Sequence, residues 1–305
     1  MAIERLVIVF LDGVGLGEGD PNRNPLAQAS MPMVQSLLEG SYLIREQAGR
    51  VTRQASLLAL DARLGVPGLP QSGTGQTTLL TGVNASALLG YHDGPYPNQQ
   101  LCALLERGNL FRSLVASGYP VAYANAYTDR FLHRIARGTQ RLSANSRAAW
   151  LAGLTLRGVQ ELQAGRAISG LLTNDYFRQQ GYKVPTISPE QAGKNLALLA
   201  REHALSYFEF WITDLAGHRQ DGDLALNVLQ QLDRFLYGLL DHLDLSRSLV
   251  LAISDHGNLE DMSTPHHTLN PAMALLIGAD HAAVAAQLND LTDVTPALLA
   301  ILVQG

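Results

Sequence analysis

Short apolar runs recur along the chain, and segments with helical periodicity lie between them. Runs rich in Val, Ile, Leu and Phe are typical of strands that are buried on both faces. The strongest runs span residues 6–11, 207–213 and 248–254, and weaker runs span 120–126 and 272–277. The sequence therefore predicts strands in these five segments.

Helical patterns separate the predicted strands. One spans residues 189–203 after Ser188, its expected cap, and another spans 223–243 with its leucines on one face. A terminal helix is expected with Thr295 as its cap and Pro296 in its first position. Strands that alternate with helices predict an α/β fold, in which a mostly parallel sheet carries helices on both faces.

The composition narrows the class of protein. A chain of 305 residues with 47% hydrophobic residues can bury a large core, which excludes a disordered or collagen-like chain and a disulfide scaffold. A net charge of -5 argues against a nucleic-acid binder. The single Cys102 favours a reducing compartment, and we expect a cytoplasmic protein. The run at 6–11 is too short for a signal peptide or membrane span, so no membrane partner is expected.

One stretch departs from this acidic balance. Residues 130–166 contain seven arginines and a single acidic residue, Glu161. The stretch can be a solvated helical face, or it can be a cap that binds an anionic substrate through guanidinium groups. In the second interpretation Arg134 and Arg137 are the candidate substrate-binding residues.

An aspartate follows each of the three strongest predicted strands: Asp12, Asp214 and Asp255. Ligands of open parallel sheets bind at the carboxyl ends of the strands, so the three acids are expected at one edge. Their mutual repulsion there requires cations.

Four of the nine histidines lie beside these aspartates in three polar segments that we expect to be loops: His218, His256, His266 and His267. Imidazole and carboxylate together are ligands of zinc and manganese. The pattern predicts a metal site.

A segment rich in glycine and hydroxyl groups, residues 68–82, precedes an apolar run. A helix that begins there would direct its positive end at an anion, and a hydroxyl at that end can act as a nucleophile. Ser72, Thr74 and Thr77 are the candidates, and spacing alone does not choose between them.

Together these motifs resemble the alkaline phosphatase superfamily, and most closely its cofactor-independent phosphoglycerate mutase and phosphopentomutase branch. The resemblance rests on Asp12, the hydroxyl-rich segment, Asp-x-x-x-His at 214–218, Asp-His-Gly-Asn at 255–258 and His-Thr-x-Asn-Pro at 267–271. Five motifs in the family's order are specific, although each one alone is weak.

The resemblance implies a role for each residue. The family's nucleophile stands ten residues before a glycine, and counting back from Gly82 gives Ser72, with Thr74 and Thr77 as alternatives. By the same resemblance, one of two divalent ions, manganese or zinc, is held by Asp214, His218 and His267. The second is held by Asp12, Ser72, Asp255 and His256, and His266 is not a ligand.

The chain also departs from the mutases, because it lacks their large inserted domain. We expect a phosphotransfer core at residues 1–127 and 185–305, with a small arginine-rich cap or insertion at 128–184. A small cap shields an intermediate from water poorly. The predicted function is therefore a binuclear-metal phosphohydrolase that cleaves a phosphate mono- or diester of an anionic small molecule through a phosphoserine. A phosphomutase and a non-catalytic metal-binding scaffold are the alternatives, and the substrate, the oligomeric state and the metal stay open.

Overall fold

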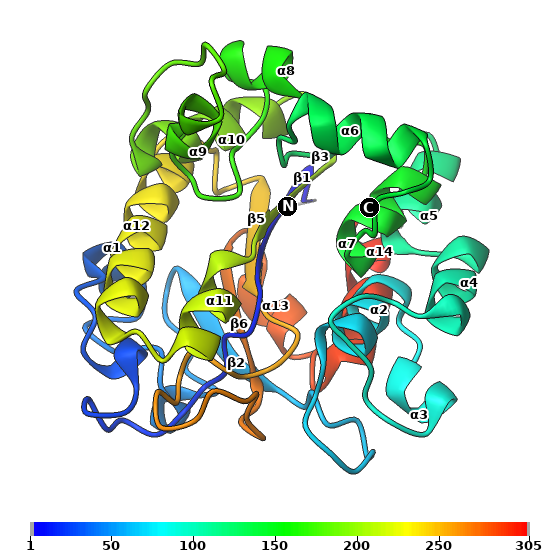
Figure 1. Ribbon diagram of the computed structural model, residues 1–305. Coiled ribbons are helices and arrows are strands. Elements are labelled where there is room, and N and C mark those ends of the chain that lie inside the picture. The colour runs from blue at the N-terminus through cyan, green and yellow to red at the C-terminus, as the bar shows by residue number, and fades with distance from the viewer. Residues whose placement is uncertain (1–2, 304–305) are drawn as a thin grey trace.

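A mixed sheet of six strands forms the centre of the molecule (Figure 1), with the strand order β2-β6-β5-β1-β4-β3. The computed structural model describes residues 3–303. The strands are β1 (Arg5–Leu11), β2 (Ala55–Leu60), β3 (Val121–Tyr123), β4 (Leu205–Phe210), β5 (Ser248–Ile253) and β6 (Ala272–Gly278). The pairs of β1 with β4, β1 with β5 and β3 with β4 are parallel, whereas β6 is antiparallel to both β5 and β2. The predicted α/β fold with a mostly parallel sheet is confirmed.

Helices surround the sheet. The α-helices are α1 (Pro32–Leu37), α2 (Ser72–Thr81), α3 (Ala85–Leu89), α4 (Gln99–Arg107), α5 (Leu110–Ala116), α6 (Asp129–Ala136), α7 (Ala144–Leu151), α8 (Val159–Gln163), α9 (Asp175–Gln179), α10 (Pro189–Ala200), α11 (Ile212–Arg219), α12 (Gly222–Leu240), α13 (His281–Ala285) and α14 (Val294–Val303). Short 3-10 helices occupy Pro25–Ala27, Arg45–Gln47 and Leu291–Asp293. None of the helices within residues 3–303 is long and apolar enough to cross a membrane.

The helices form two layers, one on each face of the sheet (Figure 1). On one face α1, α10 and α12 pack with alternate residues of the strands, such as Val9 and Phe208, in one hydrophobic core. On the other face α2, α5, α7, α13 and α14 pack with the intervening residues, such as Phe10 and Tyr207, in a second core. Successive side chains of a strand point to opposite faces, so continuous apolar runs supply both cores.

Three local expectations were wrong. The strand predicted at 207–213 ends at Phe210, because α11 begins at Ile212 and carries the segment that we expected as a loop. Strand β2 was not predicted at all. Thr295 does not cap the terminal helix: it lies inside α14, where its hydroxyl donates to the carbonyl of Leu79 at 2.6 Å and ties α14 to α2. The cap of the preceding 3-10 helix is Asp290.

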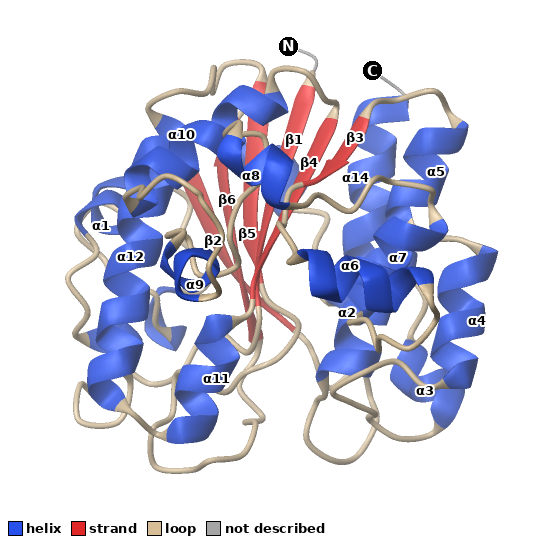
Figure 2. Ribbon diagram, turned by 45° about the horizontal axis from the view of Figure 1, so that its top comes forward, coloured by secondary structure: helices blue, strands red, loops and turns tan. Residues whose placement is uncertain are grey.

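Residues 128–184 contribute to different parts of the molecule. Helix α7 packs against α2, α4 and α5 within one helical layer. By contrast, α8 and α9 surround a small separate cluster that includes Leu162, Phe177 and Val184. In both views α6 lies on the side of α2 and α7, whereas α9 lies on the side of α10 and α12 (Figure 2). The division of the chain into a core and a cap stays a prediction.

Candidate metal centre and its cavity

The carboxyl ends of three adjacent strands bring the predicted aspartates together. Strands β5, β1 and β4 are neighbours in the sheet, and Asp255, Asp12 and Asp214 follow them. Because β6 runs antiparallel to β5, the loop between them leaves and re-enters the sheet at the same edge. His256 and His267 therefore lie beside the aspartates. The spacing of Asp214 and His218 on α11 places both on one helical face, with His218 Nε2 at 3.2 Å from Asp214 Oδ2.

Three histidines direct the same ring nitrogen, Nε2, toward this centre, because the Nδ1 atom of each ring faces a backbone carbonyl. Nδ1 of His218 lies 2.8 Å from the carbonyl of Pro265, and Nδ1 of His267 lies 2.7 Å from that of Pro70. Nδ1 of His256 lies 3.4 Å from the carbonyl of Gly257. A carbonyl can only accept, so each Nδ1 carries a proton, and each Nε2 offers a lone pair when its ring is neutral. The Nε2 atoms of His218 and His267 are 3.2 Å apart, a distance that needs a proton or a cation between them.

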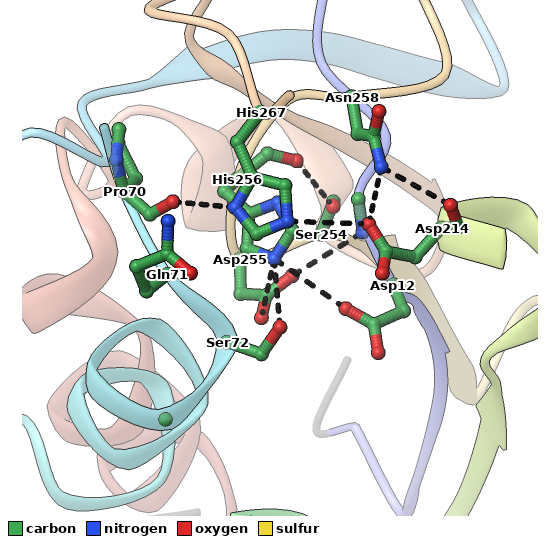
Figure 3. Close-up of polar contacts among 12 residues, drawn as sticks. Asp12, Pro70, Gln71, Ser72, Asp214, Ser254, Asp255, His256, Asn258 and His267 are labelled. Carbon is green, nitrogen blue, oxygen red and sulfur yellow. Dashed lines mark hydrogen bonds and ion pairs between the residues drawn. The ribbon is translucent and has the colours of Figure 1, made fainter. Parts of the chain in front are cut away.

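The ligand atoms form two overlapping groups. Asp214, His218 and His267 form the first, and Asp12, Asp214 and His256 form the second, with the atoms of each group within 4.8 Å of one another. Asp255 Oδ2 adjoins the second group, at 3.6 Å from His256 Nε2 (Figure 3). His266 is exposed and outside both groups.

The electrostatics of the cluster favour cations. Burial, followed by repulsion from Asp255 and Asp214, raises the pKa of Asp12 well above its ordinary value. Burial and repulsion from Asp214 raise the pKa of Asp255 to about 7. Among the described residues, Asp12 Oδ1 and Asp255 Oδ2 are buried without a hydrogen-bond partner. Bound divalent ions would relieve both the repulsion and the missing partners, so this donor set fits the metal ions that the motifs imply.

The histidines respond to the same surroundings. Burial and the neighbouring His256 lower the pKa of His267 to about 4, and burial lowers the pKa of His256. The lowered pKa values favour the neutral form of both rings, which is the form that metal ligation requires. The hydrogen bond with Asp214 raises the pKa of His218 to about 9. Burial works in the opposite direction for Asp214, but its hydrogen bonds with His218 and Asn258 hold its pKa below the ordinary value.

Ser72 is the hydroxyl that reaches this centre. It is the first residue of α2, and its Oγ lies 3.0 Å from His256 Nε2 (Figure 3). The two alternatives are engaged elsewhere: Thr74 Oγ1 donates to the carbonyl of Gln71 at 3.1 Å, and Thr77 Oγ1 donates to that of Gly73 at 2.6 Å. Of the three candidates, the structure places only Ser72 on the wall of the cavity described below.

Two glycines allow the start of α2 to approach the centre. A Cβ on Gly75 would lie 2.9 Å from the Cβ of Asp255, and one on Gly73 would lie 2.6 Å from the carbonyl oxygen of Asp93. A larger residue at either position would force the start of α2 or its neighbours to shift. These two positions therefore require glycine, because the backbone there packs too closely against neighbouring atoms to leave room for a side chain.

Two residues that the sequence analysis did not single out hold the ligands in place. Asn258 Nδ2 donates to Asp214 Oδ1 at 2.6 Å. Glu260 is buried, and one carboxylate oxygen accepts from the backbone N–H groups of Gly15 and Asn258, each at 2.8 Å.

The other carboxylate oxygen of Glu260 reaches the third loop of the centre. It accepts from the hydroxyl of Thr268 and from Asn270 Nδ2, the latter at 3.0 Å. Glu260 thus ties together the loops that follow Asp12, His256 and His267. The sequence holds a signal for it, since Glu260 lies two residues beyond the Asp-His-Gly-Asn motif.

A cavity of about 580 Å³ opens from the centre. Asp12, Ser72, Asp214 and His218 lie on its wall, together with residues of the 128–184 segment. Among the seven arginines of the arginine-rich stretch, only Arg141 lines this cavity. The predicted substrate-binding residues Arg134 and Arg137 are exposed on and just after α6, and the structure does not bring them to the cavity wall.

Comparisons with known proteins agree with this fold. The model of the Metalloenzyme superfamily matches residues 156–303. A 2,3-bisphosphoglycerate-independent phosphoglycerate mutase of Agrobacterium fabrum is 28% identical over 185 residues, which cover 52% of this chain and 36% of that mutase. The match therefore spans about a third of the length of that curated relative.

Two solved structures share the fold. The phosphoglycerate mutase of Leishmania mexicana superposes with a TM-score of 0.57 at 11% identity, covering 99% of this chain and 96% of that one. A cold-active alkaline phosphatase of Shewanella sp. gives 0.52 at 10% identity, covering 97% and 99%. The match to the family model and the donor set support a metal-dependent enzyme. The comparisons confirm the predicted resemblance to the alkaline phosphatase superfamily, near its phosphoglycerate mutase branch but without the large inserted domain.

Proposed function

We propose that this protein is a metal-dependent phosphohydrolase that cleaves a phosphate ester through a phosphoserine on Ser72. One observation carries the proposal: Ser72 Oγ, at the first turn of α2, faces the cluster of three aspartates and three histidines, lies 3.0 Å from His256 Nε2 and lines the same cavity. The proposed first metal site comprises Asp214, His218 and His267, and the second comprises Asp12, Ser72, Asp255 and His256. The proposed ions are manganese or zinc.

Two divalent ions bound there would supply positive charge that favours the deprotonated serine and offsets the charge of a phosphoryl group. The protein's own groups position the reaction. The positive end of α2 would favour a phosphate at Ser72, the first residue of that helix. Asn258 and Glu260 hold the ligand loops in one arrangement.

The reaction proceeds in two displacements. Ser72 loses its hydroxyl proton, its Oγ forms a bond to phosphorus, and the bond between phosphorus and the ester oxygen breaks. That oxygen takes a proton and leaves as the alcohol. Water then attacks the phosphoserine, which releases phosphate and restores the Ser72 hydroxyl.

A phosphomutase is the second candidate, because the curated relatives carry that name. A mutase must keep its dephosphorylated intermediate away from water and hold a small, highly charged molecule. Here the cavity wall carries one arginine and no lysine among the residues described. This lining favours hydrolysis over retention of a phosphoglycerate-like polyanion.

The test combines metal analysis with product analysis. Purified protein is loaded with manganese or zinc, and phosphate release is measured with a panel of mono- and diesters. We expect about two ions per chain and a phosphoserine on Ser72 after acid quenching. Ser72→Ala should lower kcat roughly 1,000-fold or more with its metal content retained in the first site.

Thr81→Ala is the matched control, because it removes a hydroxyl from the other end of the same helix. Interconversion of 3- and 2-phosphoglycerate without phosphate release would favour the mutase. Metal-dependent stability without any turnover would favour the scaffold.

A further inference from the structure

The cavity is lined by two chemically different sets of residues. One set comprises polar groups of the metal centre, including Asp12, Ser72 and Asp214. The remaining wall of the cavity is rich in aromatic side chains: Tyr96, Tyr127, Phe131, Tyr176, Phe177 and Trp211. This concentration of aromatic residues has no counterpart in the motifs that predicted the metal site.

Three of these cavity-lining residues are also partly exposed. Trp211 is 42% exposed, Tyr176 is 44% exposed and Tyr96 is 37% exposed. A concave site lined by exposed, large apolar side chains is typical of a ligand-binding surface. The rings come from both sides of the opening, because Phe131 belongs to α6 and Tyr176 to α9, which lie on opposite sides of the sheet edge (Figure 2).

The protein also fixes the orientation of these rings. The rings of Tyr127 and Phe131 are stacked, with centroids 4.5 Å apart and an interplanar angle of 6°. A Cβ on Gly170 would lie 2.6 Å from Trp211 Nε1, so the glycine lets the indole pack against the backbone. Trp211 directly precedes α11 and lines the same cavity as Asp214.

Charge on this wall is sparse. Arg141 stacks over the Tyr96 ring, with its guanidinium carbon 4.5 Å from the ring centroid. Glu209 is buried and accepts hydrogen bonds from Tyr123 and Asn145. A second phosphate or carboxylate on the substrate would thus meet one guanidinium at most, whereas a flat apolar group would meet several rings.

We propose that the substrate is a phosphate ester whose alcohol portion carries a planar aromatic group, which binds between the α6 and α9 sides of the cavity while the phosphate lies at Ser72. This specificity rests on the proposed hydrolase function. Aromatic stacking and apolar burial supply its affinity.

The first experiment compares esters whose leaving alkoxides have similar basicity. We expect kcat/KM for 2-phenylethyl phosphate to exceed that for propyl phosphate by about 10- to 100-fold, as apolar pockets discriminate on this scale. A nucleoside 5′-monophosphate, tested in parallel, shows whether the favoured ring is a nucleobase or a simple aryl group. Equal kcat/KM values for all three esters would overturn the proposal.

The second experiment measures binding without turnover. The chain has two tryptophans, and Trp150 is exposed on α7, so Trp150→Phe isolates the fluorescence of Trp211. In the metal-loaded protein, 2-phenylethylphosphonate should change this fluorescence with a Kd about 10-fold or more below that of propylphosphonate. Equal Kd values, or no response to either compound, would contradict the inference.

Phe131→Ala should bring the ratio of the two Kd values toward one. Tyr237→Ala is the matched control, because it removes an exposed aromatic ring from α12 outside the cavity and should preserve the ratio. The two proposals fail separately. Aromatic preference in phosphonate binding without ester hydrolysis would refute the hydrolase, and hydrolysis without that preference would refute the aromatic site.

Discussion

The metal centre and the aromatic wall share one cavity but are built in different ways. The three aspartates of the centre follow three adjacent strands, and backbone carbonyls of Pro70, Pro265 and Gly257 orient its histidines. The wall takes its rings from separate helices and loops, without a common motif. The chemistry is thus set by the topology of the sheet, whereas the proposed specificity depends on segments added at its edge.

The largest effect should follow from a change at the centre. Asp214 belongs to both ligand groups, so Asp214→Asn removes a charge from both. We expect loss of bound metal and a fall in kcat/KM of roughly 1,000-fold or more. Metal analysis and phosphate release measure the two effects. A variant that retains both ions and most activity would contradict the shared role of this carboxylate.

Removal of metal should reverse the dependence of stability on pH. In the chelated protein the pKa of Asp255 is raised to about 7 and that of His218 to about 9. The native state then binds more protons than the unfolded state, so stability falls as pH rises from roughly 6.5 to 9. The lowered pKa values of His256 and His267 affect stability only below about pH 6.5, the ordinary histidine pKa.

Metal-loaded protein should show the opposite trend, because ions bind the deprotonated ligands. Thermal unfolding at several pH values checks this, and Tm of the chelated form should fall by about 2 °C or more over this range. A Tm of the chelated protein that is constant or rises with pH would show that repulsion in the cluster is weak.

A smaller effect is expected at Glu260. Its two oxygens accept four hydrogen bonds, and Glu260→Gln replaces one acceptor by a donor. We expect about 10- to 100-fold weaker metal binding and about 1–3 kcal/mol lower stability. Equilibrium metal titration separates the positioning role from a purely structural one. The control is Asp261→Asn, which removes a neighbouring surface carboxylate paired with Arg23 and should change metal affinity little.

The smallest expected effect, a change in KM, tests which arginines bind the substrate: Arg141, or Arg134 and Arg137. Arg141→Ala removes the guanidinium that stacks on Tyr96 in the cavity, and KM should rise about 2- to 5-fold, the scale of an exposed cation–π contact. Arg134→Ala and Arg137→Ala should leave KM within about 2-fold, since exposed charges contribute little. Steady-state kinetics with one ester decide this. An equal increase in KM for Arg134→Ala would restore the interpretation of the arginine-rich stretch as a substrate-binding cap.

The sequence predicted an element correctly where the residues of that element alone determine it, and failed where packing against distant segments determines it. The continuous apolar runs predicted β1, β4, β5 and β6, because strands buried on both faces admit few polar residues. Helix α11 was missed because it has only eight residues and these are mixed in polarity. Packing against α12 stabilises it. The i,i+4 spacing of Asp214 and His218 held the clue to that helix.

By itself, the sequence determined where the chemistry lies along the chain: which aspartates follow strands, which histidines follow them, and which segment carries a hydroxyl before a helix. Such information is local, because it depends on residue type and short spacing. Only the tertiary structure decided that Ser72 faces His256 while Thr74 and Thr77 bond to the backbone. It alone brought Arg141, rather than Arg134 or Arg137, to the cavity beside the aromatic rings. These outcomes depend on how the ends of distant helices pack around one edge of the sheet, a property that no short stretch of residues encodes.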